Sequence, residues 1–241
     1  NSGHRDDALA IARAYRQSGS GFLQHLHGSF ALAVFEPRTR HALLAVDRMG
    51  ICPLAFSTPG NRLIVASSAD AIQAHPDASR ELDPQGLFNY LYFHMVPSPG
   101  SIYRRTGKLL PGEYLTYNNG RVKRSFYWQL EYLESDANEE QLPTELLSLL
   151  EKSVDRCLTG ESTGAFLSGG LDSSTVTGML ARLSDKQVDA YGIGFNSRGY
   201  DEMDFARASA RHFNADLHEY YVTPQDVIDA IPKIAAAYDE P

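Results

Sequence analysis

The pattern of apolar and polar residues changes character about halfway along this chain of 241 residues. Up to residue 130, short apolar runs are separated by turn signals, of which the clearest is Asn118-Asn119-Gly120. Asn-Gly readily adopts the positive φ angles that tight hairpin turns need. After residue 140, apolar runs alternate with stretches of helical periodicity, which is typical of a parallel sheet with helical crossovers. The pattern therefore predicts an α+β part with antiparallel sheets, followed by an α/β part.

Two helices are predicted in the first part. The alanine-rich residues 8–16 indicate a helix with Asp6 or Asp7 as its cap. A second helix is expected at 84–93, capped by Asp83 and with proline at its first position. The strands of this part are expected at residues 30–35, as a buried strand, and at 41–46, 54–56, 62–66, 113–117 and 121–127.

Residues 131–140 hold five acidic side chains, and we interpret them as an exposed connection between domains. This interpretation divides the chain into domains 1–130 and 141–241. In the second domain, strands are expected at 165–167, 188–195 and 217–222, and helices at 142–158, from 173 onward, at 204–213 and at 224–238.

The stretch 164–174 has the composition of an anion site. A short apolar strand leads into Gly169 and Gly170, and a helix follows, so that unpaired N–H groups and the helix dipole face the turn. The turn also carries three hydroxyl donors, Ser168, Ser173 and Ser174. Asp172 would repel a phosphate unless a divalent cation lies between them. The alternative is a serine-capped helix after a loop, which the full seven-residue pattern disfavours.

Several motifs resemble those of a known family. Residues 166–174 resemble the PP-loop of the ATP pyrophosphatases, and residues 47–54, Asp-Arg-Met-Gly-Ile-Cys-Pro-Leu, resemble a signature of class II glutamine amidotransferase domains. Further segments resemble the asparagine synthetase family in the family's order: 26–31, 81–84, 108–112, 127–128, 191–195, 200–202 and 239–241. The resemblance to this family covers nearly the whole chain.

The resemblance implies both a fold and an activity. The first domain would be part of a glutaminase of the N-terminal-nucleophile type, and the second would be the beginning of a PP-loop domain of the adenine nucleotide hydrolase type. The implied reaction is ATP-dependent amide formation through an acyl-adenylate, in which glutamine supplies ammonia to aspartate or another carboxylate. ATP and Mg2+ would be required, and a homodimer is the usual assembly in the resembling family.

The resemblance also implies site residues. Phe166 and Leu167 would line the adenine or ribose, and Ile193 would contact adenine through its backbone, although it is also a natural core residue of a strand. The pyrophosphate and Mg2+ would be held by Ser168, Gly169, Gly170, Leu171, Asp172, Ser173 and Ser174, with Asp172 as the metal ligand. Asp7 matches an aspartate that holds the α-ammonium group of glutamine, and the alternative is that it only caps its helix.

The glutaminase nucleophile of the resembling family is an N-terminal cysteine that uses its own α-amino group as base. Residue 1 here is Asn, and Cys52 and Cys157 lie mid-chain. We therefore expect both domains to be partial, no catalytic nucleophile within residues 1–241, and no glutamine hydrolysis by this chain alone. Cys52 is interpreted as a small, half-buried residue.

Composition narrows the function classes. A net charge of −8 argues against an extended nucleic-acid surface, and no apolar run is long enough to span a membrane. Two distant cysteines without a C-x-x-C motif favour the reducing cytoplasm. Departures from the family pattern at 66–68 and 160–164 keep two alternatives open. One is a specialised ligase that closes an internal amide, as β-lactam synthetases and peptide cyclases do, and the other is a non-catalytic relative.

Overall fold

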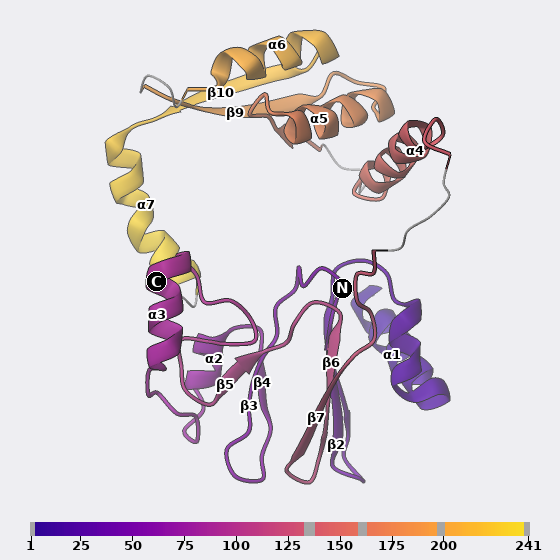
Figure 1. Cartoon of the computed structure of the whole chain (residues 1–241), viewed down its shortest axis with the longest axis vertical. Helices are drawn as coiled ribbons and strands as arrows, with labels where there is room; N and C mark the ends of the chain where they lie inside the picture. Colours follow the sequence, from indigo (N-terminus) through magenta and orange to yellow (C-terminus); the bar gives the residue numbers. More distant parts are fainter. Residues whose placement is uncertain (1–2, 133–137, 159–162, 197–200, 239–241) are drawn as a thin grey trace. The chain divides into compact units, whose positions relative to one another are not determined.

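The computed structural model describes residues 3–132, 138–158, 163–196 and 201–238 (Figure 1). The chain forms two compact units, one of residues 1–132 and 234–241 and one of residues 133–233. No helix within the described ranges has the length and apolar character needed to cross a membrane.

The first unit contains two antiparallel sheets, in agreement with the sequence pattern. One has the order β1-β2-β6-β7 and the other β4-β3-β5. Their strands are β1 (Ala31–Glu36), β2 (His41–Val46), β3 (Ala55–Ser57), β4 (Ile64–Ala66), β5 (Thr106–Lys108), β6 (Glu113–Asn118) and β7 (Arg121–Phe126). The hairpin between β6 and β7 turns through Asn119 and Gly120, both at positive φ, as the Asn-Gly pair predicts.

Strand β2 separates two apolar clusters because its successive side chains point to opposite faces. Leu44 and Val46 pack with Leu54 and Leu115 in one cluster. Leu43 packs in the other, together with residues of helix α1 (Gly3–Ser18) and the 3-10 helix η1 (Gly19–His25). This central strand is therefore buried on both faces, and it organises the unit.

Two predictions for the first unit are wrong. Residues 30–35 do not form a buried strand: β1 is an edge strand in which Leu32 is buried while Phe35 is 62% exposed. Neither Asp6 nor Asp7 caps the first helix, because α1 already begins at Gly3 and both residues lie inside it.

Helix α3 (Pro84–Phe93) confirms the local capping signal. The Asp83 carboxylate accepts a hydrogen bond from the Gly86 N–H at 3.0 Å, and the proline occupies the first turn. The short helix α2 (Ala69–Gln73) and strand β5 were not predicted from the sequence.

The second unit is built on a parallel sheet of order β10-β9-β8, as the alternating pattern predicts. Its elements are α4 (Leu142–Asp155), β8 (Ala165–Phe166), α5 (Leu171–Leu183), β9 (Asp189–Phe195), α6 (Met203–Phe213) and β10 (Asp216–Val222), and α7 (Pro224–Ala237) follows. In β9, Ala190 and Gly192 are buried while Tyr191 and Ile193 are exposed, so the strand has a covered and an open face.

Helices α5 and α6 pack directly against each other. A side chain at Gly178 of α5 would meet the Phe213 ring of α6 at 2.7 Å, and the hydroxyls of Ser174 and Ser209 lie 2.9 Å apart. Because both helices belong to right-handed crossovers that step across the sheet in one direction, they cover the same face. Their N-termini meet at the carboxyl-terminal edge of the strands.

Candidate functional site

The candidate site is the turn between β8 and α5, at the carboxyl-terminal edge of the parallel sheet. Strand β8 ends at Phe166 and α5 begins at Leu171, two residues earlier than the predicted helix start. Ligands of open α/β sheets bind at this edge, outside the carboxyl ends of the strands. The fold therefore puts the glycine-rich turn where a ligand site is expected.

Two serine hydroxyls close the turn on itself. The Oγ atoms of Ser168 and Ser173 lie 3.0 Å apart, and Ser173 Oγ also accepts the Ser168 N–H at 3.2 Å. The Gly170 N–H donates to Ser168 Oγ at 3.3 Å, and Ser173 Oγ donates to the Gly170 carbonyl at 3.3 Å. These local bonds hold the shape of the turn.

Position 169 requires glycine both because of its backbone conformation and because of the atoms that surround it. Its φ is +84°, and a Cβ there would lie 2.4 Å from the Ala206 nitrogen and from the Phe205 carbonyl carbon. The backbone of α6 thus lies directly against the loop. At Gly170 a Cβ would meet only Ser168 Oγ, at an ordinary 3.4 Å.

The first turn of α5 leaves hydrogen-bond donors available. Gly170 is the N-cap residue and has no side chain with which to cap the helix. The N–H groups of Leu171, Asp172 and Ser173 have no intrahelical partner because they belong to the first turn, whereas the Ser174 N–H bonds to the Gly170 carbonyl. Together with the helix dipole, these donors make the turn suited to an anion.

Asp172 is exposed in this first turn. Among the residues that the structure describes, Asp172 belongs to no group of three potential metal ligands. Mg2+ needs no such group, because it is usually held by one or two carboxylates together with substrate phosphates and water. A single free carboxylate beside an anion-binding turn therefore fits Mg2+ that arrives with a nucleotide.

The remaining residues assigned to the nucleotide differ in accessibility. The side chains of Phe166 and Leu171 are 80% and 83% exposed, whereas that of Leu167 is in the core. A ligand could thus reach only the backbone of Leu167. The Ser174 hydroxyl lies against Ser209 and joins the two helices.

Ile193 lies on β9 beyond the end of β8. The Leu167 N–H donates to the Tyr191 carbonyl at 2.9 Å, which shows the side of β9 that faces β8. Alternate residues of a strand turn their backbone groups to the same side, so the N–H and C=O of Ile193 point toward the loop side as well. This orientation is consistent with a backbone contact to a bound base.

The glutamine-related predictions fall on the first unit. Asp7 is exposed on α1. Cys52 is half-buried, as expected, Cys157, in the second unit, is exposed, and both thiols are free. The landmarks at 160–162, 200 and 239–241 lie outside the described residues.

Sequence reasoning missed the role of Asp47, which begins the amidotransferase signature. Its side chain is 1% exposed and accepts backbone N–H groups at 3.0–3.2 Å from Phe30, Met49, Ile51 and Cys52. Burial alone would raise the pKa of this carboxyl, but the four N–H donors outweigh burial and lower it. The motif itself showed an aspartate before Arg-x-Gly, but it did not show that the Phe30 N–H would bond to this carboxylate.

The structure shows two joined parts, one with antiparallel sheets and helices and one with a parallel sheet and helices. Residues 3–128 match the family model of the glutamine amidotransferase domain, and residues 145–241 match that of asparagine synthase. The chain belongs to the asparagine synthetase family.

Three relatives illustrate this membership. The chain is 29% identical to a protein of Methanocaldococcus jannaschii assigned as asparagine synthetase (glutamine-hydrolyzing) 2, over 98% of this chain and 47% of the relative. It is 25% identical to asparagine synthetase (glutamine-hydrolyzing) 1 of Bacillus subtilis, over 97% and 36%. It is 27% identical to amidase chry2 of Gibberella zeae, over 90% and 34%. The chain spans less than half the length of these relatives.

Proposed function

We propose that this chain is part of an ATP-dependent, glutamine-using ligase of the asparagine synthetase type. The observation that carries the proposal is the turn at 168–174, which is preformed by its own serines and presents open N–H donors beside the exposed Asp172. Family membership supplies the reaction class. We further infer a glutaminase fold of the N-terminal-nucleophile type and a PP-loop fold for the two parts, a cytoplasmic location and a homodimer.

In the proposed reaction, a carboxylate oxygen of the acceptor, such as aspartate, attacks the α-phosphorus of ATP. Pyrophosphate leaves and an acyl-adenylate forms. Ammonia from glutamine then attacks the acyl carbon, and AMP departs with the bonding electron pair. The loop N–H groups would hold the pyrophosphate as its negative charge grows, and this interaction would be stronger in the transition state than in the ground state.

The residues have distinct proposed roles. The backbone of 168–173 would bind the β- and γ-phosphates, and the backbone of Ile193 and Leu167, with the exposed Phe166, would position the nucleoside. Bound Mg2+, held by Asp172, would neutralise part of the charge on the leaving pyrophosphate. Asp7 would hold the ammonium group of glutamine, in a pocket that the described residues of this chain do not complete.

The Asp172→Asn variant of the full-length protein tests the proposal. We expect pyrophosphate release to fall about 100-fold or more, the order seen when a group that stabilises transition-state charge is removed. The circular dichroism spectrum should not change, because the side chain is exposed. Asp185→Asn, another exposed aspartate of the same unit, is the matched control and should retain activity. Normal pyrophosphate release by Asp172→Asn would refute the assignment.

A specialised amide-forming ligase is the second candidate. It is favoured by Cys52 within the signature segment and by the Ala66-Ser67-Ser68 segment. Both candidates predict adenylation at the same loop. Incubation of the full-length protein with ATP and candidate carboxylates distinguishes the two candidates. Amide formation that requires glutamine or ammonia supports the first candidate. An internal amide formed without either supports the second.

We also propose domain boundaries at 1–130 and 141–241, joined by the acidic segment 131–140. The two compact units also divide after Tyr132, but residues 234–241 are grouped with the first unit and not with 141–233. Limited proteolysis should cut first within 131–140 and release two resistant fragments. A first cut within 30–66 or 166–195 would contradict these boundaries.

A further inference from the structure

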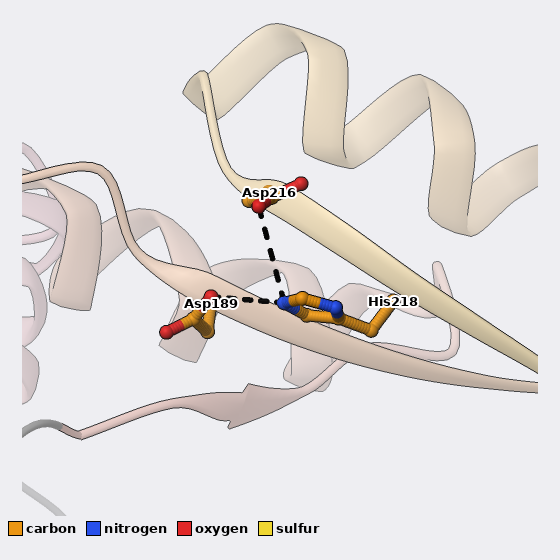
Figure 2. A group of neighbouring side chains, drawn as sticks. All are labelled: Asp189, Asp216 and His218. Atoms are coloured by element: carbon orange, nitrogen blue, oxygen red, sulfur yellow. Dashed lines mark hydrogen bonds and ion pairs between the residues drawn. The ribbon is translucent and has the colours of Figure 1, made fainter.

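A second cluster of ionisable side chains lies in the parallel sheet, outside the loop. Asp189 is the first residue of β9, and Asp216 is the first residue of β10, directly beside it in the register. His218 follows two residues later on β10 and points toward both (Figure 2). The cluster lies at the amino-terminal ends of the strands, whereas the loop lies at their carboxyl-terminal edge. Phe166, the last residue of β8 before the loop, pairs with Tyr191, which lies two residues, roughly 7 Å, along β9 from Asp189.

The imidazole is oriented between the two carboxylates. His218 Nε2 lies 2.9 Å from Asp189 Oδ1 and 4.0 Å from Asp216 Oδ2, and the three ligand atoms all lie within 4.8 Å of one another. The Tyr191 ring stacks on the imidazole with centroids 4.9 Å apart. Gly164 leaves the space for this ring, because a Cβ at 164 would meet Tyr191 Cε2 at 2.8 Å.

The charges of the cluster are unbalanced without a cation. Like charges directly opposite each other on neighbouring strands repel, and Asp189 and Asp216 are such a pair. A divalent cation would offset both and would relieve the repulsion.

We propose that Asp189, Asp216 and His218 form a binding site for a divalent transition-metal ion of the Zn2+ type, which links β9 to β10. Ligands at about 2.0–2.2 Å from a tetrahedral ion lie about 3.3 Å from one another, so exposed side chains already within 4.8 Å need only small rotations. A nitrogen ligand favours Zn2+, Co2+ or Ni2+ over Mg2+ and Ca2+. Solvent would complete the coordination, and none of the three residues is one that we assign to Mg2+ in the proposed reaction.

Calorimetric titration of the full chain with Zn2+, and with Co2+ as an optical probe, tests the site. We expect His218→Gln and Asp189→Asn each to remove one binding equivalent or to weaken it at least tenfold, on the scale known for metal-site substitutions. His212→Gln, an exposed histidine on α6 of the same unit, is the matched control and should bind like wild type. Zn2+ should raise the thermal unfolding midpoint of wild type and of His212→Gln, but not of His218→Gln.

Far-UV circular dichroism identifies variants that have not folded. If His218→Gln or Asp189→Asn does not fold, Asp216→Asn takes its place in the titration. Equal stoichiometry and affinity in wild type, His218→Gln and Asp216→Asn would overturn the proposal, since Zn2+ would then bind elsewhere. Displacement of Co2+ by equimolar Mg2+ would also overturn it, because the ligands would then behave as an acidic patch.

Discussion

The segments around Asp47 and around Asp172 contain similar residues, but their backbone N–H groups are satisfied differently. Each combines an aspartate, glycines and a turn after a strand. Asp47 is buried and its carboxylate takes up four backbone N–H groups, so the turn is satisfied within itself. Asp172 is exposed, and the N–H groups of its turn stay open. The comparison teaches that one signature motif can satisfy its own backbone, whereas another leaves N–H donors open for the ligand that we propose.

Glycine substitutions in the Asp172 turn should give the largest change in stability. Gly169→Ala puts a Cβ into the backbone of α6 at a positive φ, and we expect it to destabilise the chain by roughly 3–5 kcal/mol. Gly170→Ala is the matched control and should cost under about 1 kcal/mol, because its Cβ has room. Urea unfolding measures both, and equal costs would mean that α6 does not lie against the loop.

Asp47→Asn should destabilise the chain by about 3 kcal/mol, because an amide cannot accept four N–H donors and its own NH2 group opposes them. Asp172→Asn in the same assay should change stability by less than about 0.5 kcal/mol, since its side chain is exposed. Equal losses in the two variants would abolish the contrast between a satisfied and an open turn.

The pH dependence sharpens the Asp47 prediction. The folded state lowers the pKa of Asp47 below its ordinary value of 3.8, so its contribution is fully present above that pH and is lost as the pH falls through the folded pKa. The stability difference between wild type and Asp47→Asn should therefore be constant near neutral pH and should narrow below pH 3.8. A difference that widens on acidification would exclude an ionised Asp47.

The smallest effect concerns the link between the two helices beneath the loop. The hydroxyls of Ser174 and Ser209 lie 2.9 Å apart, so a double-mutant cycle of Ser174→Ala and Ser209→Ala should give a coupling of about 1 kcal/mol. Ser153→Ala, which loses only a bond to its own helix, combined with Ser209→Ala should give no coupling. If the effects of Ser174→Ala and Ser209→Ala were additive, the two hydroxyls would not be coupled, and Ser174 would be available for a role in the loop.

Local chemistry explains most of what the sequence predicted. The Asn119-Gly120 turn, the Asp83 cap and the 168–174 turn each depend on neighbours within a few residues, and each appears in the structure. The predicted burial of β1 and the predicted start of α1 were wrong because both features depend on strand order and on packing. The short elements α2 and β5 had too few residues to show a period.

The site could be predicted only up to its own loop. The serines that shape the turn are adjacent in sequence, but the approach of Phe205 and Ala206 to Gly169 comes from a helix more than thirty residues away. The inner position of the Leu167 side chain and the contact of Asp47 with Phe30 are likewise results of packing. Such contacts between distant segments leave no periodic signal in one sequence.

The close approach of α6 to Gly169 bears on how relatives of this chain should be sorted. A glycine held in place by a neighbouring helix has to be kept even in a protein that no longer binds a nucleotide. The exposed Asp172 has no such packing role, so under the proposed function it would be free to change in relatives that no longer bind the ligand. In a genome survey, the glycine would therefore mark descent, and the aspartate would mark the descendants that still use the site.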